Sequence, residues 1–164
     1  QLSRTTAVAL AIELDAASAD HLSASTDADI EALAASSTVA TLLPGAEFST
    51  QHEGKLGRRF LDRGARVAIA SDCNPGSSYT TSMPFCIASA VSLLGFTVEE
   101  AVLAATLGGA QALRREDIGQ LAIGKRADLV LLDAPSYIHL AYRPGVNLIH
   151  STYKSGRAVT SWQK

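Results

Sequence analysis

The segment with the most chemical potential is 71–78, whose sequence is SDCNPGSS. Its carboxylate, Asp72, comes directly after a short apolar run. Desolvation at the end of a buried strand favours the neutral acid unless a cation or hydrogen bonds stabilise the charge. A metal ion is one such cation, so Asp72 is a candidate metal ligand and catalytic residue. The alternative is a plain turn, because Asp, Asn, Pro and Gly are common turn residues.

Three residues that follow Asp72 are suited to binding a ligand. Asn74 supplies a side-chain amide, Gly76 a backbone that a ligand can approach closely, and Ser77 a hydroxyl. This combination favours recognition of a polar or anionic small molecule, and the three residues are candidate substrate-binding positions.

His21 is the second candidate catalytic residue, because it lies at the end of another expected strand. With an unperturbed pKa of about 6.5, a histidine can act as a metal ligand, a general acid or base, or a hydrogen-bond donor. The alternative is a structural histidine, which is the commoner case beside an apolar stretch. His52, His139 and His150 have weaker surroundings and are expected to be surface or loop residues.

Other catalytic signatures are missing from the sequence. It has no Gly-x-Ser-x-Gly elbow, phosphate loop or dinucleotide fingerprint. Cys73 is expected to point away from a site that contains Asp72, because neighbouring residues of an extended chain face opposite sides. Metal-assisted hydrolysis therefore remains the leading interpretation.

Strand-like and helical segments alternate through the first two thirds of the chain. The runs 38–43 and 67–70 are continuously apolar or β-prone, and 16–22 is a weaker example. Continuous runs are typical of parallel sheets, whose strand ends carry the chemistry. These ends fall at Asp20-His21, Pro44-Gly45 and Ser71-Asp72. The expected helices are 2–14, 28–36 with Asp27 as N-cap, 56–63, 84–94, and 98–113 after a Thr97-x-x-Glu100 capping box.

The pattern changes near Glu116. Beyond it, glycines separate short β-prone runs at 129–132 and 148–153, followed by a hairpin-like segment at 154–157. We therefore expect two parts, residues 1–115 and residues 116–164.

Composition limits the partners of the protein. The chain has 164 residues, 47% of them apolar, which is enough for a core but short of the roughly 250 residues of a complete αβ barrel. A net charge of −2 with interspersed signs argues against nucleic acid and a membrane surface. The expected partner is a small molecule. Two isolated cysteines favour a reducing, cytoplasmic environment, and the lone methionine, Met83, suggests that the natural start is missing.

Several segments resemble a known family. Segment 119–133, GQLAIGKRADLVLLD, is similar to the C-terminal signature of the amidohydrolase superfamily. Segments 18–22 (SADHL), 42–45 (LLPG), 71–78 and 81–84 (TSMP) resemble the imidazolonepropionase family in order and spacing, and 142–148 (YRPGVNL) fits its tail. The resemblance implies an α/β fold: the C-terminal part of a TIM-like (β/α)8 metal-dependent hydrolase barrel plus part of a small β-sandwich domain.

The resemblance also implies a reaction, the hydrolysis of the cyclic amide of 4-imidazolone-5-propanoate to N-formimidoyl-L-glutamate in histidine degradation. By analogy, Asp72 is the last protein ligand of one Zn or Fe ion and accepts a proton from the attacking water. His21 would polarise the carbonyl or stabilise the oxyanion. Asn74, Gly76 and Ser77 match positions that hold the propanoate and formimidoyl groups.

The chain departs from the family in one respect. The other metal ligands of that family, a His-x-His pair and a fifth-strand histidine, are absent from this sequence. The chain is therefore expected to begin just after that histidine, with Gln1 at the next polar position, to be inactive alone, and to form a homodimer at full length. Two alternatives remain: another amidohydrolase, such as a deaminase or a dihydroorotase-like enzyme, and an inactive fragment.

Overall fold

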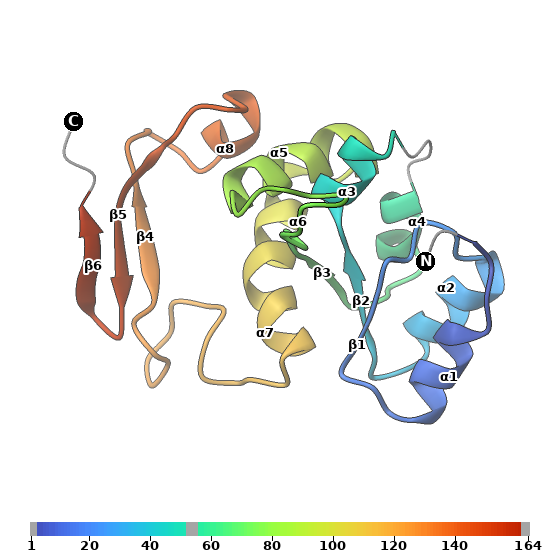
Figure 1. Ribbon diagram of the computed structural model, residues 1–164. Coiled ribbons are helices and arrows are strands. Elements are labelled where there is room, and N and C mark those ends of the chain that lie inside the picture. The colour runs from blue at the N-terminus through green and yellow to red at the C-terminus, as the bar shows by residue number, and fades with distance from the viewer. Residues whose placement is uncertain (1–2, 52–55, 162–164) are drawn as a thin grey trace.

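Two β-sheets organise the protein, for which a computed structural model describes residues 3–51 and 56–161. Figure 1 shows the two sheets on opposite sides of a group of helices. The first sheet contains β1 (Ser18–Asp20), β2 (Val39–Leu42) and β3 (Val67–Ile69), and the second contains β4 (Leu129–Leu132), β5 (Ile149–Lys154) and β6 (Arg157–Ser161).

The first sheet is parallel, with β2 between β1 and β3. Asp20 pairs with Thr41, and Leu42 pairs with Ile69, so the three strands end at the same edge. Every residue of β2 and β3 is buried. The continuous apolar runs thus predicted this sheet correctly, because a strand covered on both faces has no polar alternation.

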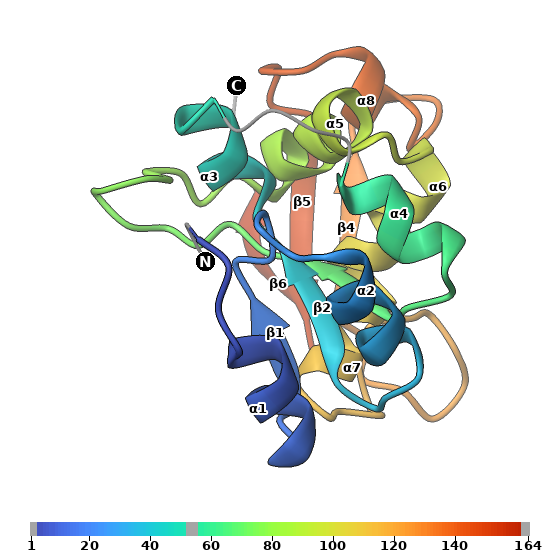
Figure 2. The same ribbon diagram turned by 90° about the vertical axis from the view of Figure 1, so that its right-hand side faces the viewer.

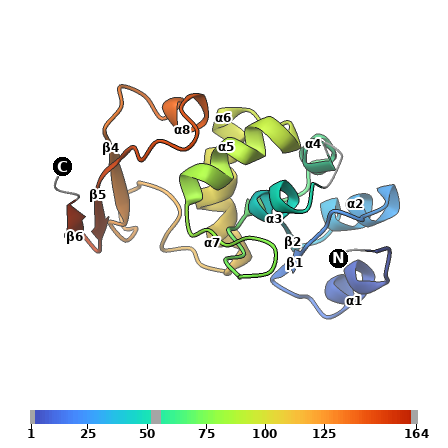
Figure 3. The ribbon, with the colours of Figure 1, turned by 45° about the horizontal axis from the view of Figure 1, so that its top comes forward.

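The helices flank the parallel sheet. Viewed from above, the order across the molecule is the second sheet, then α5 to α7, then the parallel sheet, then α1 and α2 (Figure 3). The helical elements are α1 (Ala7–Glu13), α2 (Asp27–Ala34), α3 (Pro44–Ser49), α4 (Leu56–Asp62), α5 (Met83–Leu94), α6 (Val98–Leu103), the π-helical turn η1 (Ala104–Gly108), α7 (Gly109–Ala112) and α8 (His139–Tyr142).

Three helix starts differ from expectation. Helix α1 begins at Ala7, whereas the expected helix began at residue 2. The N-cap of α2 is Thr26 and not Asp27: the Thr26 side chain accepts from the backbone N–H of Asp29, whose carboxylate accepts in return. Pro44 was expected only to stop β2, but it also begins α3, since proline is favoured in the first helical turn, where its missing N–H has no partner to lose.

The predicted helix over 98–113 is present as three consecutive elements, α6, η1 and α7. The π-helical turn lies against β3. A Cβ atom built on Gly108 would be 2.1 Å from the carbonyl oxygen of Val67, so this contact requires glycine. The turn brings the helix backbone directly onto the strand that leads to Asp72.

The second sheet is antiparallel, with β5 between β4 and β6. Strands β4 and β5 and the 154–157 hairpin agree with the sequence pattern, while β6 and α8 were not predicted. Among the described residues this part of the chain forms one three-stranded sheet, and a second sandwich layer is not seen. Within residues 3–51 and 56–161, no helix combines the length and the apolar character needed to cross a bilayer.

Candidate functional site

The candidate site lies at the edge where the parallel strands end. His21 follows β1 directly, α3 begins two residues after β2, and Asp72 comes three residues after β3. Figure 2 shows the loop from β3 to α5 extending beside α3 at this edge. The parallel arrangement therefore brings together segments that are far apart in the sequence, such as those that contain His21 and Asp72.

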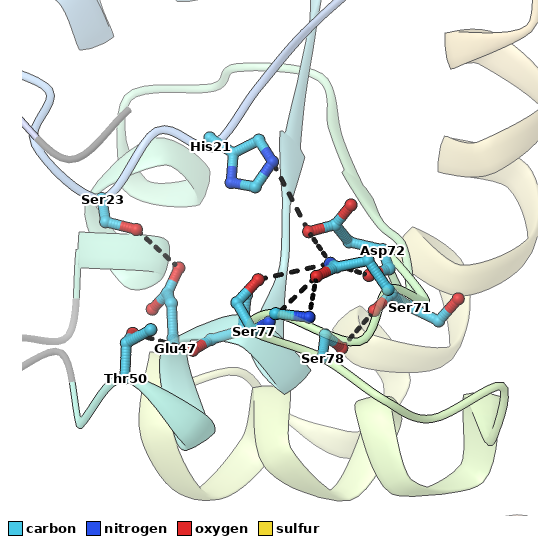
Figure 4. Close-up of polar contacts among 11 residues, drawn as sticks. His21, Ser23, Glu47, Thr50, Ser71, Asp72, Ser77 and Ser78 are labelled. Atoms are coloured by element: carbon cyan, nitrogen blue, oxygen red, sulfur yellow. Dashed lines mark hydrogen bonds and ion pairs between the residues drawn. The ribbon is translucent and has the colours of Figure 1, made fainter.

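His21 and Asp72 face each other across this edge (Figure 4). The Nε2 atom of His21 lies 3.5 Å from Oδ2 of Asp72, and the two side chains are 50% and 27% exposed. Both groups can thus reach a ligand from solvent while remaining in electrostatic contact. When protonated, the imidazole forms an ion pair with the carboxylate; when neutral, it still presents a ring nitrogen towards it.

Both residues have a left-handed backbone conformation, with φ of 58° at His21 and 47° at Asp72. Residues other than glycine rarely adopt this region, which costs an estimated 1–3 kcal/mol where the surroundings impose it. Six of the described non-glycine residues have a positive φ, and His21 and Asp72 are two of them; the others are Asp15, Gln51, Arg114 and Ser155. The hydrophobic periodicity of the sequence does not predict the left-handed conformations of His21 and Asp72.

The side-chain amide of Asn74 organises the loop that follows Asp72. Its Oδ1 accepts hydrogen bonds from the backbone N–H groups of Gly76 at 2.8 Å and Ser77 at 2.9 Å. Its Nδ2 donates to the backbone oxygen of Asp72 at 2.6 Å, to Oδ2 of Asp72 at 3.2 Å and to Oγ of Ser77 at 3.3 Å. The structure therefore connects the predicted metal ligand to the predicted substrate-binding residues through Asn74.

The same loop is held against α3. Ser78 is buried, and its hydroxyl donates to the carbonyl of Ser71 at the start of the loop. A Cβ atom on Gly45 would approach Oγ of Ser78 to 2.5 Å, so the LLPG motif needs glycine at this position. The Pro-Gly pair thus has a packing role as well as a role in ending β2.

Sequence reasoning missed Glu47 in α3. This carboxylate is only 7% exposed, and it accepts a hydrogen bond from Ser23 at 3.5 Å. Figure 4 places it on the far side of Ser77 from Asp72, below His21. A buried carboxylate close to the end of the middle strand is a signal of function. Nothing in the sequence indicates that Glu47 is buried, because helix α3, which contains it, was not predicted.

The remaining candidates lie elsewhere. Cys73 is exposed, and His150 lies on β5 and is also exposed. His139 belongs to α8, where it contacts the ring of Tyr142 edge to face. Gln1 and His52 lie outside the described residues. Burial raises the pKa of the Cys86 thiol on α5, which keeps it neutral and unreactive.

The donor set suits part of a metal site. Asp72 and His21 are both metal-binding residue types, and their facing atoms are close enough to surround a shared ligand. Within the described residues, however, no group of three or more His, Cys, Asp or Glu side chains could hold an ion. A cavity of about 610 Å³ lies away from this edge, between the start of α5 and segment 143–149, and neither His21 nor Asp72 lines it.

Comparison with known proteins gives the family. The sequence profile of the Amidohydrolase family matches residues 5–159. The chain belongs to the amidohydrolase family. Among curated relatives of this amidohydrolase, the imidazolonepropionase of Streptomyces avermitilis is 62% identical over 159 residues, which cover 97% of this chain and 38% of that protein. The imidazolonepropionase of Mycolicibacterium smegmatis is 61% identical over 163 residues, covering 99% and 41%. The chain thus spans about two fifths of the length of these relatives.

Solved structures support the fold of this amidohydrolase. An adenosine deaminase from Xanthomonas campestris with bound zinc matches with a TM-score of 0.77 and 22% identity, over 94% of this chain and 43% of that one. The parallel sheet and its helices therefore form a portion of a TIM-like hydrolase barrel, as the sequence predicted.

Proposed function

We propose that this chain is the C-terminal part of an imidazolonepropionase, which hydrolyses the cyclic amide of 4-imidazolone-5-propanoate to N-formimidoyl-L-glutamate. The observation that carries the proposal is the placement of His21 3.5 Å from Asp72 at the strand ends, beside the 74–77 loop. The identity of about 60% to curated imidazolonepropionases over nearly the whole chain supports the same substrate.

Asp72 is proposed as a ligand of one divalent ion, Zn or Fe, whose other ligands come from the part of the protein that this chain does not contain. Such an ion lowers the pKa of bound water and stabilises negative charge on oxygen. The carboxylate of Asp72 accepts a proton from the attacking water. Water adds to the ring carbonyl, the carbon–nitrogen bond then breaks, and the departing nitrogen takes up a proton.

His21 is proposed to hold the carbonyl oxygen of the substrate. A hydrogen bond from a ring N–H to this oxygen strengthens as the oxygen gains negative charge, and it therefore stabilises the transition state more than the bound substrate. The exposed imidazole, fixed at the end of β1, is in a suitable place for this contact. The loop that contains Asn74, Gly76 and Ser77 is proposed to hold the propanoate and formimidoyl groups.

The two-part organisation is also a proposal. Residues 1–115 would be the barrel part and residues 116–164 the contribution to a small β-domain. In support, the helices that pack on the parallel sheet end at Ala112, and β4 begins at Leu129. Exposed apolar residues on the antiparallel sheet, including Val130, Leu131 and Val159, are consistent with a second layer covering it.

Replacement of Asp72 tests the proposal in the full-length protein. In Asp72→Ala, loss of the ion and of the proton acceptor lowers kcat/KM for 4-imidazolone-5-propanoate by about 10²- to 10⁴-fold. Bound Zn or Fe, measured by elemental analysis, falls with it. The matched control is Asp20→Ala, which removes an exposed carboxylate at the neighbouring strand end. Intact metal content and turnover in Asp72→Ala would show the central assignment to be wrong.

A further inference from the structure

The orientation of the Asn74 amide is determined by its surroundings. Two backbone N–H groups, those of Gly76 and Ser77, point at one end of the amide. Backbone N–H groups can only donate, so the atom that they meet must be the oxygen, Oδ1. The nitrogen, Nδ2, is therefore the end that faces Asp72.

All the hydrogen-bonding capacity of this amide is used within the loop. The two lone pairs of Oδ1 accept from the two backbone groups, and the two hydrogens of Nδ2 are directed at Asp72 and at Oγ of Ser77. A direct bond from Asn74 to substrate would have to break one of these contacts. In the structure as it stands, the amide therefore acts on Asp72 and on the loop, in addition to the part that this loop is proposed to play in holding the substrate.

The contact with Asp72 falls on one carboxylate oxygen. Nδ2 of Asn74 lies 3.2 Å from Oδ2, and Nε2 of His21 lies 3.5 Å from the same atom. Within the described part of the chain, the other oxygen, Oδ1, takes part in no hydrogen bond or ion pair. The hydrogen bond from Nδ2 and the nearby imidazole both favour one orientation of the carboxylate, and Oδ1 is left for a further ligand.

We propose that Asn74 is a positioning residue for Asp72: it orients the carboxylate so that Oδ1 is presented to the divalent ion. The inference rests on the proposed role of Asp72 as a metal ligand. Ligating carboxylates are themselves hydrogen-bonded in metal sites, and loss of such a partner weakens metal binding by about 10- to 100-fold. Asn74 also supports the left-handed backbone of Asp72 through its 2.6 Å bond to the Asp72 carbonyl.

Asn74→Ser in the full-length protein tests this role. Serine can still accept a hydrogen bond from a backbone N–H two residues on, so the turn is kept, but its short side chain does not reach the Asp72 carboxylate. The dissociation constant for Zn²⁺, measured by competition with a chelator, is expected to rise by about 10- to 100-fold. Asn74→Ala, which removes all these contacts, should weaken Zn²⁺ binding at least as much.

Ser77→Ala is the matched control, because it removes the other partner of Nδ2 without touching Asp72. Its dissociation constant for Zn²⁺ should stay within about twofold of that of the parent, a difference well below the expected effect of Asn74. Circular dichroism and thermal unfolding of each variant establish that the protein is folded.

Each outcome decides the inference. Weaker Zn²⁺ binding in both Asn74 variants, with Ser77→Ala unaffected, supports it. Unchanged Zn²⁺ affinity with a raised KM would overturn it and leave Asn74 with the proposed substrate contact alone, while leaving the proposed function intact. Unchanged Zn²⁺ binding in Asp72→Ala would instead contradict the proposed role of Asp72 as a metal ligand, on which the inference about Asn74 rests.

Discussion

The two sheets of the molecule differ in burial although their strands have similar sequences. Strands β2 and β4 are both short and contain no charged residue; their sequences are VATL and LVLL. Every residue of β2 is buried, whereas none of β4 is, and Val130 and Leu131 are each 46% exposed. In the parallel sheet, side chains along β2 and β3 do not reach solvent, so chemistry there is expected at the strand ends.

The largest effect is expected from replacing His21, which lies at the end of β1 in the parallel sheet. In His21→Ala, loss of the proposed contact with the substrate carbonyl is expected to lower kcat on the order of 10²- to 10³-fold, with metal content nearly unchanged. Steady-state kinetics and elemental analysis of the full-length protein measure both quantities. The exposed histidine of the antiparallel sheet is the control: His150→Ala should leave kcat unaltered. Loss of the ion in His21→Ala would mean that His21 is itself a ligand.

An intermediate effect, on stability, is expected from replacing Gly108, which packs against β3. Gly108→Ala places a methyl group 2.1 Å from the carbonyl oxygen of Val67, so the helix must move away from the strand, at a cost of about 1–3 kcal/mol of unfolding free energy. Gly109→Ala is the matched control, since a Cβ there meets nothing within 4 Å. It should be neutral or stabilise the helix by up to about 1 kcal/mol. Urea unfolding that gave equal values for the two variants would contradict this packing.

The smallest effect concerns acid stability. Arg58 lowers the pKa of Glu100 in α6 below its ordinary value of 4.5 through a hydrogen bond and charge, against a smaller effect of burial. A carboxyl whose pKa is lower in the folded state stabilises the protein above its unfolded pKa, and this stability is lost as the pH falls through the folded value. The unfolding free energy of the parent should therefore fall more steeply below about pH 4.5 than that of Glu100→Gln.

An ion pair next to the antiparallel sheet can be compared with the Arg58–Glu100 pair. The carboxylate of Asp128, just before β4, also has a pKa lowered by a neighbouring arginine, Arg126. The two ion pairs are similarly exposed: the exposed fractions of the side chains are 31% and 31% for Arg126 and Asp128, and 32% and 29% for Arg58 and Glu100. Asp128→Asn should therefore change the acid limb of the stability curve about as much as Glu100→Gln. A much larger change in one of the two variants would contradict this comparison.

Sequence reasoning predicted the parallel sheet because its signals are local. The run that becomes β3 is apolar without interruption, and it stops at Ser71 and Asp72, so both the strand and the candidate site at its end can be recognised. The same holds for the helix after Thr97, whose capping box is complete in the sequence and in the structure.

Features that depend on contacts between distant segments could not be predicted in this way. Helix α3 is short and begins with proline, a residue that also ends strands, so its sequence is ambiguous. The burial of Glu47 follows from the position of α3 against the β1 loop, and the π-helical turn follows from the approach of Gly108 to β3. The direction of the Asn74 amide likewise depends on how segment 72–78 closes on itself.

The left-handed backbone at His21 and Asp72 has an evolutionary consequence. Glycine would relieve the conformational cost at both positions, but it would also remove the imidazole and the carboxylate. On the roles proposed for His21 and Asp72, selection for thermal stability and selection for turnover favour different residues at these two positions. A homologue that had lost its activity would be free to accumulate glycine there, and these two positions would record the loss before the core of the barrel did.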